Sequence, residues 1–326
     1  MKKNLFILLL SIAFICNCQL MNAAKWRVNN ISGIHADFTT AQAVNDSAYV
    51  LPGDTVYFEG SGASYGDLTL SKRLVIIGPG YFLNENDSTQ ANLASASLGT
   101  IFIYPGAENS VVTGIKAVGT LYLSCGNVLL KRNNLQYLYI GDAGPVSNNV
   151  VLQCWIYSVL IYSGCQNNTF KNNCFTIATQ WQYAYYMHNN TSGLFLNNIT
   201  NCRCQFYNCE VRNNIQVPPG GSARETWDLY GSSISTNNIA ASNQVGSDNG
   251  NQSLVDMSTV FMYSGSTDGQ YKLKPGSPAI GAGYEGVDCG VFGGPQPYIL
   301  SGLPTVPAIW KLDVNGPTVT LKAKSH

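Results

Sequence analysis

Acidic side chains, which most hydrolytic and metal-dependent chemistry requires, are scarce in this chain. Only 11% of its 326 residues are charged, compared with about 25% in an average soluble domain. From Ser110 to Ile215 the acidic residues are Asp142 and Glu210, which are far apart in the sequence. A glycoside hydrolase needs two carboxyl groups about 5–9.5 Å apart, and calcium needs about six to eight oxygen ligands. We therefore expect no metal site and no cofactor, and the composition does not favour an enzyme.

Basic side chains are the remaining candidates for acid–base catalysis. Lys131 and Lys171 occupy equivalent positions of a repeated pattern, and Arg132 and Arg212 occupy the next position. A polysaccharide lyase would need a base of this kind to remove a proton from its substrate. Like charges at repeated positions are more simply explained as solvated surface residues. If the chain is an enzyme, we expect a polysaccharide lyase before a glycoside hydrolase.

Aromatic side chains are better candidates for ligand binding. Tyr122 and Tyr139 lie at the centres of equivalent apolar segments, so strand alternation predicts that they point outward if their neighbours form the core. The segment from Gln180 to Asn190 adds Trp181, Tyr183, Tyr185, Tyr186 and His188. Aromatic rings offer flat apolar surfaces with polar edges, against which sugar rings can pack. These seven residues are the predicted substrate-binding face. The alternative is a cross-strand tyrosine ladder that only stabilises a sheet.

A short pattern that returns from about Asn109 to Ile239 must position these side chains. Two small polar residues, usually Asn-Asn, precede one apolar residue, and the pattern recurs at intervals of roughly twenty residues, which is typical of solenoids. Its members are Asn133-Asn134-Leu135, Cys154-Trp155-Ile156, Asn173-Cys174-Phe175, Asn197-Asn198-Ile199, Asn213-Asn214-Ile215 and Asn237-Asn238-Ile239. Short apolar runs bounded by Gly, Ser and Asn indicate strands, and stacked Asn side chains can form hydrogen-bonded ladders. The pattern predicts a β-solenoid; the alternative is a β-sandwich in which the Asn pairs are only turns.

The first 24 residues have the features of a secretory signal peptide. Two lysines precede an apolar run from Leu5 to Ile15, and the small residues Ala23-Ala24 follow. We expect cleavage near Ala23 or Ala24, while Cys16 leaves a lipoprotein anchor as an alternative. The apolar run is too short to span a membrane, and no later stretch of the sequence is apolar enough to do so.

The two ends of the solenoid need covers, because an open coil exposes its apolar interior. Phe38 to Tyr49 is the predicted N-terminal capping helix. Ile309 to Lys324 contains two predicted strands around Asn315-Gly316, a hairpin turn signal, and we expect this hairpin to cover the final coil or to pack along its side. The predicted division is a signal peptide over 1–24, a β-helix with its cap over 25–300, and a hairpin or tail over 301–326.

Eight cysteines follow the predicted signal peptide: residues 125, 154, 165, 174, 202, 204, 209 and 289. An even number in an exported chain is compatible with disulfides. Cys125 and Cys165 are two coils, about 9.6 Å, apart, which exceeds disulfide distance. Cys154 with Cys174, and a pair among the three cysteines at 202–209, remain possible. Zinc is disfavoured because paired C-x-x-C spacing and nearby histidines are missing, and buried free thiols are the simplest interpretation.

The N-terminal and C-terminal parts of the chain carry a resemblance to a known superfamily. Phe38 to Gly80, with AQAVND, LPGDTVYFEG and LVIIGPGY, resembles the entry segment of right-handed parallel β-helix proteins of the pectate-lyase-like superfamily. The segments DGQYKLKPGSPAIGAG, DCGVFGG and PYILSGLPTVPAIWKL resemble the tail of exported β-helix proteins of the Bacteroidetes type. The implied fold is all-β: a single-stranded right-handed parallel β-helix (β-solenoid) with an N-terminal capping helix and a C-terminal β hairpin. This superfamily includes lyases, hydrolases and non-catalytic surface proteins, so the resemblance does not settle the activity.

The expected function follows from the charge-poor repeats and their aromatic residues. The net charge is zero, which gives no support for a nucleic-acid partner. We expect a secreted or cell-surface protein that binds a polysaccharide or another extracellular polymer without catalysis. A polysaccharide lyase or glycoside hydrolase is one alternative, and a structural or adhesive solenoid is another. The sequence leaves the oligomeric state open.

Overall fold

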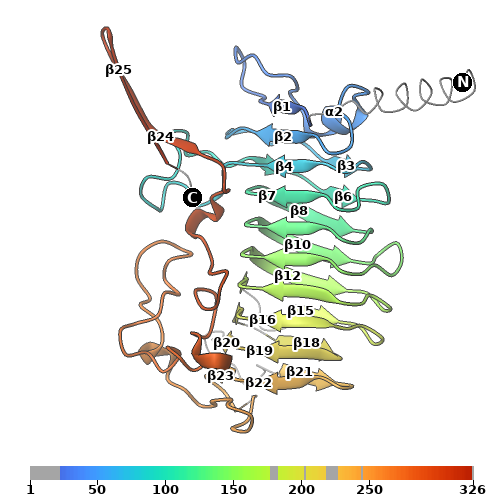
Figure 1. Cartoon of the computed structure of the whole chain (residues 1–326), viewed down its shortest axis with the longest axis vertical. Helices are drawn as coiled ribbons and strands as arrows, with labels where there is room; N and C mark the ends of the chain where they lie inside the picture. The colour runs from blue at the N-terminus through green and yellow to red at the C-terminus, as the bar shows by residue number, and fades with distance from the viewer. Residues whose placement is uncertain (1–22, 177–182, 202, 218–226, 244, 325–326) are drawn as a thin grey trace, which may run out of the picture.

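The protein is a parallel β-solenoid, as the repeats predict (Figure 1). The computed structural model describes residues 23–176, 183–201, 203–217, 227–243 and 245–324. Successive coils stack along one long axis, and each strand pairs in parallel with the strand one coil away. Within the described residues the single antiparallel sheet is a C-terminal hairpin.

Two parallel sheets form the walls of the solenoid. Sheet A contains β1 (Lys25–Val28), β2 (Thr55–Phe58), β4 (Val75–Ile77), β7 (Val111–Thr113), β9 (Leu129–Lys131), β11 (Val150–Leu152), β13 (Asn168–Lys171), β16 (Gly193–Leu196), β19 (Cys209–Arg212) and β22 (Ile234–Thr236). Sheet B contains β3 (Leu68–Leu70), β5 (Ser97–Leu98), β6 (Ile101–Ile103), β8 (Lys116–Leu123), β10 (Asn134–Ile140), β12 (Trp155–Ile161), β14 (Cys174–Phe175), β15 (Tyr183–Met187), β17 (Ile199–Thr200), β18 (Arg203–Tyr207), β20 (Ile215–Gln216), β21 (Trp227–Tyr230) and β23 (Ile239–Ala240). Beyond β12, sheet B divides: β14, β17, β20 and β23 continue its first half, and β15, β18 and β21 continue its second half.

Apolar side chains stack in columns inside the coils. One column of sheet A joins residues that are at most 1% exposed: Val56, Ile76, Val112, Leu130, Val151, Phe170, Phe195 and Val211. In the later coils these side chains are rings, and Phe195 packs on Phe175 at 5.4 Å and on Phe206 at 5.1 Å between centroids. Strand alternation places these residues inward and leaves every second residue facing outward.

A buried asparagine ladder closes one corner of the coils. Its members are Asn133, Cys154, Asn173, Asn198, Asn214, Asn238 and Asn251. Asn198 is typical: its Oδ1 accepts from the Asn173 backbone N–H at 2.8 Å, and its own N–H donates to Asn214 Oδ1 at 2.7 Å. The ladder therefore satisfies backbone groups that the corner leaves without sheet partners.

The residue before each ladder position adopts a left-handed backbone conformation. Arg132, Gln153, Asn172, Asn197, Asn213 and Asn237 form this corner column, with φ between 52° and 59°. Asn tolerates this conformation better than most residues, which explains its frequency here. The predicted role of Asn at tight corners and in a ladder is confirmed, but two adjacent columns share the task.

The predicted alignment of the repeats slips by one residue after Phe175. Phe175 pairs with Thr200, whereas Ile199 pairs with Cys174. Phe175 consequently lies in the interior, while Ile199 faces outward against the C-terminal part of the chain. A shift of one residue reverses the face of every side chain in a strand, so the two groups of apolar anchors are not equivalent.

The same one-residue slip changes the predicted alignment of the basic residues. Register places Lys131, Lys171 and Arg212 in one column, separated by Leu152 and Leu196. Arg132 belongs to the corner column instead, and it is buried. The prediction that Arg132 and Arg212 share a position is therefore wrong.

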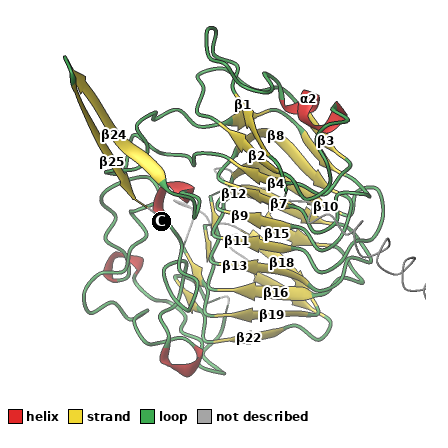
Figure 2. Cartoon of the chain, turned by 45° about the horizontal axis from the view of Figure 1, so that its top comes forward, coloured by secondary structure: helices red, strands yellow, loops and turns green. Residues whose placement is uncertain are grey.

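After β23 the chain returns along the outside of the solenoid toward its N-terminal coils (Figures 1 and 2). This part contains three short 3-10 helices, η1 (Met257–Thr259), η2 (Tyr284–Gly286) and η3 (Leu300–Gly302). We call residues 281–304 the returning tail. Corner side chains hold its backbone: Asn172 Nδ2 donates to the carbonyls of Val291 and Gly293, both at 2.8 Å. Similar bonds run from Asn237 to Ala282, from Asn197 to Asp288, from Gln153 to Gln296 and from Arg132 to Leu303.

The C-terminal part of the chain buries the outer face of the first half of sheet B. Cys174, Ile199, Ile215 and Ile239 point outward from its strands and pack in a second apolar cluster with Val260, Phe261, Cys289 and Val291. The strands β14, β17, β20 and β23 are therefore buried on both faces. The second half is not part of that cluster.

The predicted capping helix is present as α2 (Ala41–Asp46), within the expected Phe38 to Tyr49. Thr40 caps its N-terminus, with Oγ1 accepting from the Ala43 N–H, and Ala41 and Val44 are buried. Residues 1–22, most of the predicted signal peptide, lie outside the described residues. Among the described residues, no helix is long and apolar enough to cross a membrane.

The predicted hairpin forms, but its predicted position is wrong. β24 (Ala308–Asn315) and β25 (Thr318–Lys324) pair around Asn315 and Gly316. The hairpin projects from the N-terminal end of the solenoid and does not cover the final coil (Figures 1 and 2). The reason is the returning tail, which carries the chain back along the solenoid before β24 begins.

Six described cysteines are buried free thiols, as the simplest interpretation predicts: residues 125, 154, 165, 174, 209 and 289. Cys204 is also buried, and Cys202 lies outside the described residues. Cys154 occupies a ladder position, where its Sγ accepts from the Asn133 N–H at 3.4 Å. A thiol thus replaces the amide in one coil of the ladder.

We expect Asn198→Ala to lower the free energy of unfolding by about 2–4 kcal/mol, because it leaves the buried Asn173 N–H without an acceptor. Urea unfolding followed by circular dichroism measures this change. Asn189→Ala, at an exposed position, is the matched control and should cost less than about 0.5 kcal/mol. Equal losses for both variants would contradict the role of the ladder.

We expect Asn172→Gly to loosen the returning tail while preserving the corner, since glycine adopts positive φ readily. Hydrogen exchange should speed up at the tail amides of Gly290 and Tyr298, which donate to backbone carbonyls. Asn167→Gly, another position with positive φ, is the control and should leave these amides protected. Unchanged exchange in Asn172→Gly would show that the corner side chains do not hold the tail.

Candidate functional site

Aromatic rings line the outer face of the second half of sheet B. One column contains Phe102, Tyr122 and Tyr139, continues through Leu160, and reaches Tyr186. Tyr122 lies between Leu121 and Leu123, which are both 0% exposed. The predicted outward orientation of Tyr122 and Tyr139 is therefore confirmed.

Further rings extend this face beside the first column. We call the whole set the aromatic strip: Phe102, Tyr122, Tyr137, Tyr139, Tyr162, Tyr183, Tyr186 and His188. Phe102 and Tyr122 stack at 5.0 Å and 8° between ring planes, and Tyr162 stacks on His188 at 5.6 Å and 10°. Because stacked rings cover each other's faces, these two pairs present mainly edges and polar atoms to solvent.

The strip is interrupted in one coil. Strand β12 places Ser158 beside Tyr137 and Leu160 beside Tyr139 of the preceding coil, so a small and an aliphatic residue stand where the neighbouring coils have rings. The resulting hollow, which we call the slot, has a volume of about 330 Å³. Its lining residues are Tyr137, Tyr139, Ser158, Val159, Leu160, Tyr183 and Tyr186.

The two aromatic walls of the slot stand on strands that are separated by one strand. Tyr139 and Tyr186 are two strands apart in the stack, so their backbones are about 9.6 Å apart. Leu160 occupies the strand between them and carries no ring, which leaves the hollow between the aromatic walls. The Ser158 hydroxyl donates to the Tyr183 carbonyl at 2.7 Å and fixes the floor of the slot.

An ion pair borders the slot beyond Tyr183. The Arg203 guanidinium lies 4.3 Å from the centre of the Tyr183 ring, and its Nη2 is 2.8 Å from Asp228 Oδ2. The ion pair holds the guanidinium over the outer ring, and a cation in this position packs favourably on an aromatic face. It supplies polar groups at the edge of an otherwise aromatic surface.

Three tyrosines of the strip, Tyr139, Tyr162 and Tyr183, have a raised pKa and keep their protons at neutral pH. Burial, followed by the neighbouring Tyr122 and Tyr137, raises the pKa of Tyr139 above its ordinary value. Burial likewise raises the pKa of Tyr162, to which Asp142 contributes, and it raises the pKa of Tyr183. These hydroxyls are hydrogen-bond donors and acceptors, and they are not bases at neutral pH.

The structure brings five of the seven predicted site residues together: Tyr122, Tyr139, Tyr183, Tyr186 and His188. Tyr185 is a correction, because it is 0% exposed and packs on Phe170 and Phe195 in the core. The segment forms strand β15, in which Tyr185 pairs with the inward-facing Val159. Trp181 lies outside the described residues.

Sequence reasoning missed Phe102, Tyr137, Tyr162 and Arg203. Tyr137 lies two residues after the buried anchor Leu135, so strand alternation would place it on the inner face. A shift in register between Leu135 and Tyr137 interrupts that alternation, and Tyr137 lines the slot instead. Phe102 precedes the region in which the repeat is recognisable. The position of Arg203 beside Tyr183 depends on how two distant coils align.

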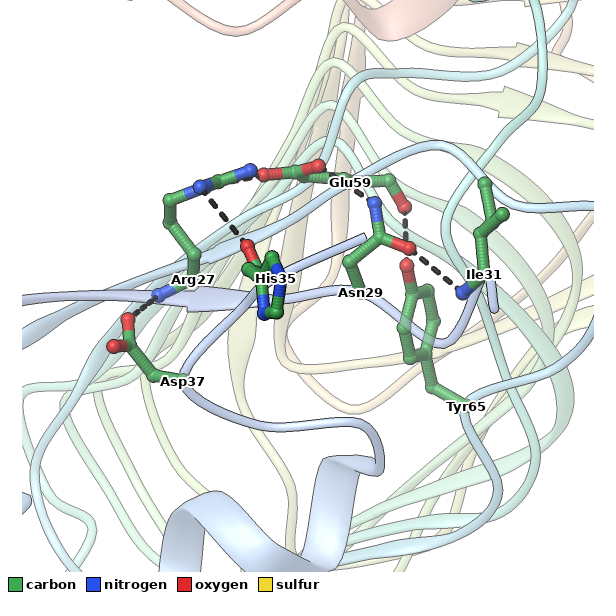
Figure 3. A network of polar contacts seen from close by, with 7 residues as sticks. All are labelled: Arg27, Asn29, Ile31, His35, Asp37, Glu59 and Tyr65. Atoms are coloured by element: carbon green, nitrogen blue, oxygen red, sulfur yellow. Dashed lines mark hydrogen bonds and ion pairs between the residues drawn. The ribbon is translucent and has the colours of Figure 1, made fainter. Parts of the chain in front are cut away.

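Four carboxylates of the described residues pair with basic side chains: Glu59, Glu210, Asp228 and Asp313. Near the N-terminus, Glu59 accepts from Arg27 at 2.6 Å and from Asn29 at 2.7 Å, while its carbonyl accepts from Tyr65 (Figure 3). Burial would raise the pKa of Glu59, but its bonds to Arg27 and Asn29 outweigh this effect and lower the pKa. An ionised carboxylate of this kind cannot act as a general acid at neutral pH.

A larger hollow of about 810 Å³ lies over β13, β16, β19 and β22. Its charged residues already contact other protein groups: Glu210 pairs with Arg212 at 2.9 Å, and Arg212 lies 4.6 Å from the centre of the Tyr284 ring. Its volume is greater than that of the slot, but it lacks facing rings. We therefore regard the slot as the stronger candidate.

The basic column beside this hollow does not form a recognisable catalytic centre. Burial, followed by Arg132, lowers the pKa of Lys131, and burial, followed by Arg212, lowers the pKa of Lys171. Among the described residues, no group of three or more His, Cys, Asp and Glu side chains could hold a metal ion. Neither lysine is therefore seen beside an acidic metal site.

Comparisons with known proteins add no family assignment. The chain has no significant match among protein-family models, curated proteins or solved structures.

Proposed function

We propose that this protein binds a glycan along the aromatic strip, with one sugar ring seated in the slot, and that it does not transform the glycan. The observation that carries the proposal is the pair of aromatic walls, Tyr137 and Tyr139 on one side and Tyr183 and Tyr186 on the other. A sugar ring has apolar C–H faces and polar edges, so it can pack between rings while its hydroxyls reach polar groups.

The polar groups around the slot suit a neutral ligand. The hydroxyls of the tyrosines offer donors and acceptors, and the Arg203 cation is neutralised by Asp228 at 2.8 Å. The described residues that line the slot include no lysine or arginine, so they give no particular advantage to an acidic polymer. We therefore propose a neutral polysaccharide as the ligand.

The proposal includes export and a distant relationship. The features of residues 1–24 support secretion or display at the cell surface, with lipid anchoring at Cys16 as the alternative. The resemblance of the entry and tail segments supports a place in the pectate-lyase-like superfamily, in the Bacteroidetes type of exported β-helix proteins. The scarcity of carboxylates in the repeats, with Asp142 and Glu210 between residues 110 and 215, supports binding without catalysis.

We expect the double substitution Tyr139→Ala and Tyr186→Ala to weaken retardation in gels that contain neutral polysaccharide by at least about tenfold in apparent Kd, because it removes one ring from each wall. Tyr49→Ala, at a tyrosine that is 82% exposed and far from the strip, is the matched control and should bind as the unsubstituted protein does. Far-UV circular dichroism checks that the solenoid remains folded.

Three outcomes would contradict this proposal. Equal retardation of the double variant would remove the slot from binding. An ultraviolet-absorbing unsaturated product or new reducing ends would show that the protein is a lyase or a hydrolase. Absence of binding to neutral and acidic polysaccharides would favour a structural or adhesive solenoid.

We expect glycan binding to stay constant from about pH 7 to about pH 9, because the tyrosine hydroxyls remain protonated. The ordinary tyrosine pKa is about 10, and burial raises those of Tyr139, Tyr162 and Tyr183. A raised pKa extends the neutral form to higher pH, so any loss should begin only above the ordinary value. Affinity electrophoresis at several pH values measures this, and a steep loss below pH 9 would contradict it.

A further inference from the structure

The C-terminal hairpin is amphipathic across its two faces. Cross-strand pairing places Leu312 opposite Leu321 and Val314 opposite Val319. Ile309 and Ala323 pair on the same face, since residues opposite one another in a ladder share a face. We call the face made by Ile309, Leu312, Val314, Val319, Leu321 and Ala323 the apolar face of the hairpin. Lys311, Lys322, Asp313 and Thr320 pair on the other face.

This apolar face is bare in the folded chain. Its large side chains are 43% exposed at Ile309, 53% at Leu312 and Leu321, 61% at Val319 and 70% at Val314. A two-stranded hairpin without a covered apolar face is only marginally stable in water. The face is therefore suited to contact with another apolar surface.

Its size argues against a second copy of this chain as the covering surface. Two strands, each about 4.8 Å wide and with seven residues rising about 3.4 Å, present a face of about 230 Å². A stable protein interface buries about 800 Å² on each partner. Two hairpins packed face to face would fall well short of that area.

The charge of the hairpin indicates what the surface is. The hairpin contains three lysines, Lys311, Lys322 and Lys324, and one acidic residue, Asp313. It therefore has an excess of two positive charges, although the net charge of the whole chain is zero. Lys311 pairs with Asp313 at 2.9 Å, so that among the described residues Lys322 and Lys324 have no acidic partner. Trp310 lies beside the Lys322 amino group, at 5.2 Å from its ring centre. Lysines and tryptophan next to a bare apolar face are typical of elements that lie in a lipid interface.

The position of the hairpin allows it to reach a flat surface. In both views it stands beside the N-terminal coils and points away from the solenoid (Figures 1 and 2), with its turn at Asn315 and Gly316. Its backbone contact with the body includes a bond from the Ala91 N–H to the Ile309 carbonyl at 2.8 Å, at the base of β24. The remainder of the hairpin is free to lie on a bilayer.

We propose that this hairpin docks the protein on an anionic lipid bilayer. The apolar face enters the boundary between headgroups and acyl chains, and Lys322, Lys324 and Trp310 lie at the level of the headgroups. Docking of this kind is peripheral and does not require a membrane-spanning segment. The proposal is independent of glycan binding, because the aromatic strip is on the wall of the solenoid.

The test is co-sedimentation of the processed chain, beginning at Lys25, with vesicles of phosphatidylcholine alone or mixed equally with phosphatidylglycerol. The protein should sediment with the anionic vesicles. The double substitution Leu312→Ser and Leu321→Ser should weaken this binding at least about tenfold, since it removes apolar contact. Leu254→Ser, at a leucine that is 73% exposed on the body of the protein, is the matched control and should bind normally.

A second double substitution separates charge from hairpin folding. Lys322→Gln and Lys324→Gln leave the apolar face intact, so they should reduce binding to anionic vesicles and abolish its dependence on salt. Failure of the unsubstituted protein to sediment with anionic vesicles would overturn the proposal. So would equal binding by all variants. Sedimentation-velocity ultracentrifugation without vesicles then tests for a dimer that depends on Leu312 and Leu321, and such a dimer would replace the lipid with a second copy of this chain.

Discussion

The sharp corner between the two sheets governs the rest of this structure. Every coil must turn there, which forces one residue into a left-handed backbone conformation with φ near that of Asn172 at 53°. The residue after it is removed from regular sheet pairing, so its backbone N–H needs another acceptor. Asparagine meets both requirements at adjacent positions. The first Asn adopts the left-handed conformation, and the side-chain amide of the next accepts a backbone hydrogen bond in the ladder. The stack can continue only while these two columns stay aligned.

The same corner also determines which surfaces are covered. Side chains that turn outward from it hold the backbone of the returning tail, as Asn172 does with Val291 and Gly293. The C-terminal part of the chain then buries the first half of sheet B, where Ile199 and Ile239 belong to the second apolar cluster. The second half of the sheet carries rings that pack on one another along the strip and line the slot beside Ser158 and Leu160. A polar ligand with apolar faces is the natural partner of such a surface.

The two proposed binding surfaces have compatible places in the molecule. The aromatic strip lies along the wall of the solenoid, and the hairpin projects from its N-terminal end (Figure 1). A bilayer contacted by the hairpin would leave the wall accessible to a polymer in solution. The returning tail makes this arrangement possible, because it brings the C-terminus of the chain back to the N-terminal coils.

The sequence by itself determined the solenoid, its capping helix, its hairpin and the outward orientation of Tyr122 and Tyr139. These features follow from local rules: strand alternation, turn chemistry and the tolerance of Asn for left-handed corners. Only the tertiary structure decided the one-residue slip between Phe175 and Ile199, the burial of Tyr185, the slot opposite Leu160 and the place of the hairpin. Each of these depends on which residues of one coil face those of the next, or on where the tail packs. Insertions of variable length change that alignment, and a shift of one residue exchanges the inside and the outside of a strand.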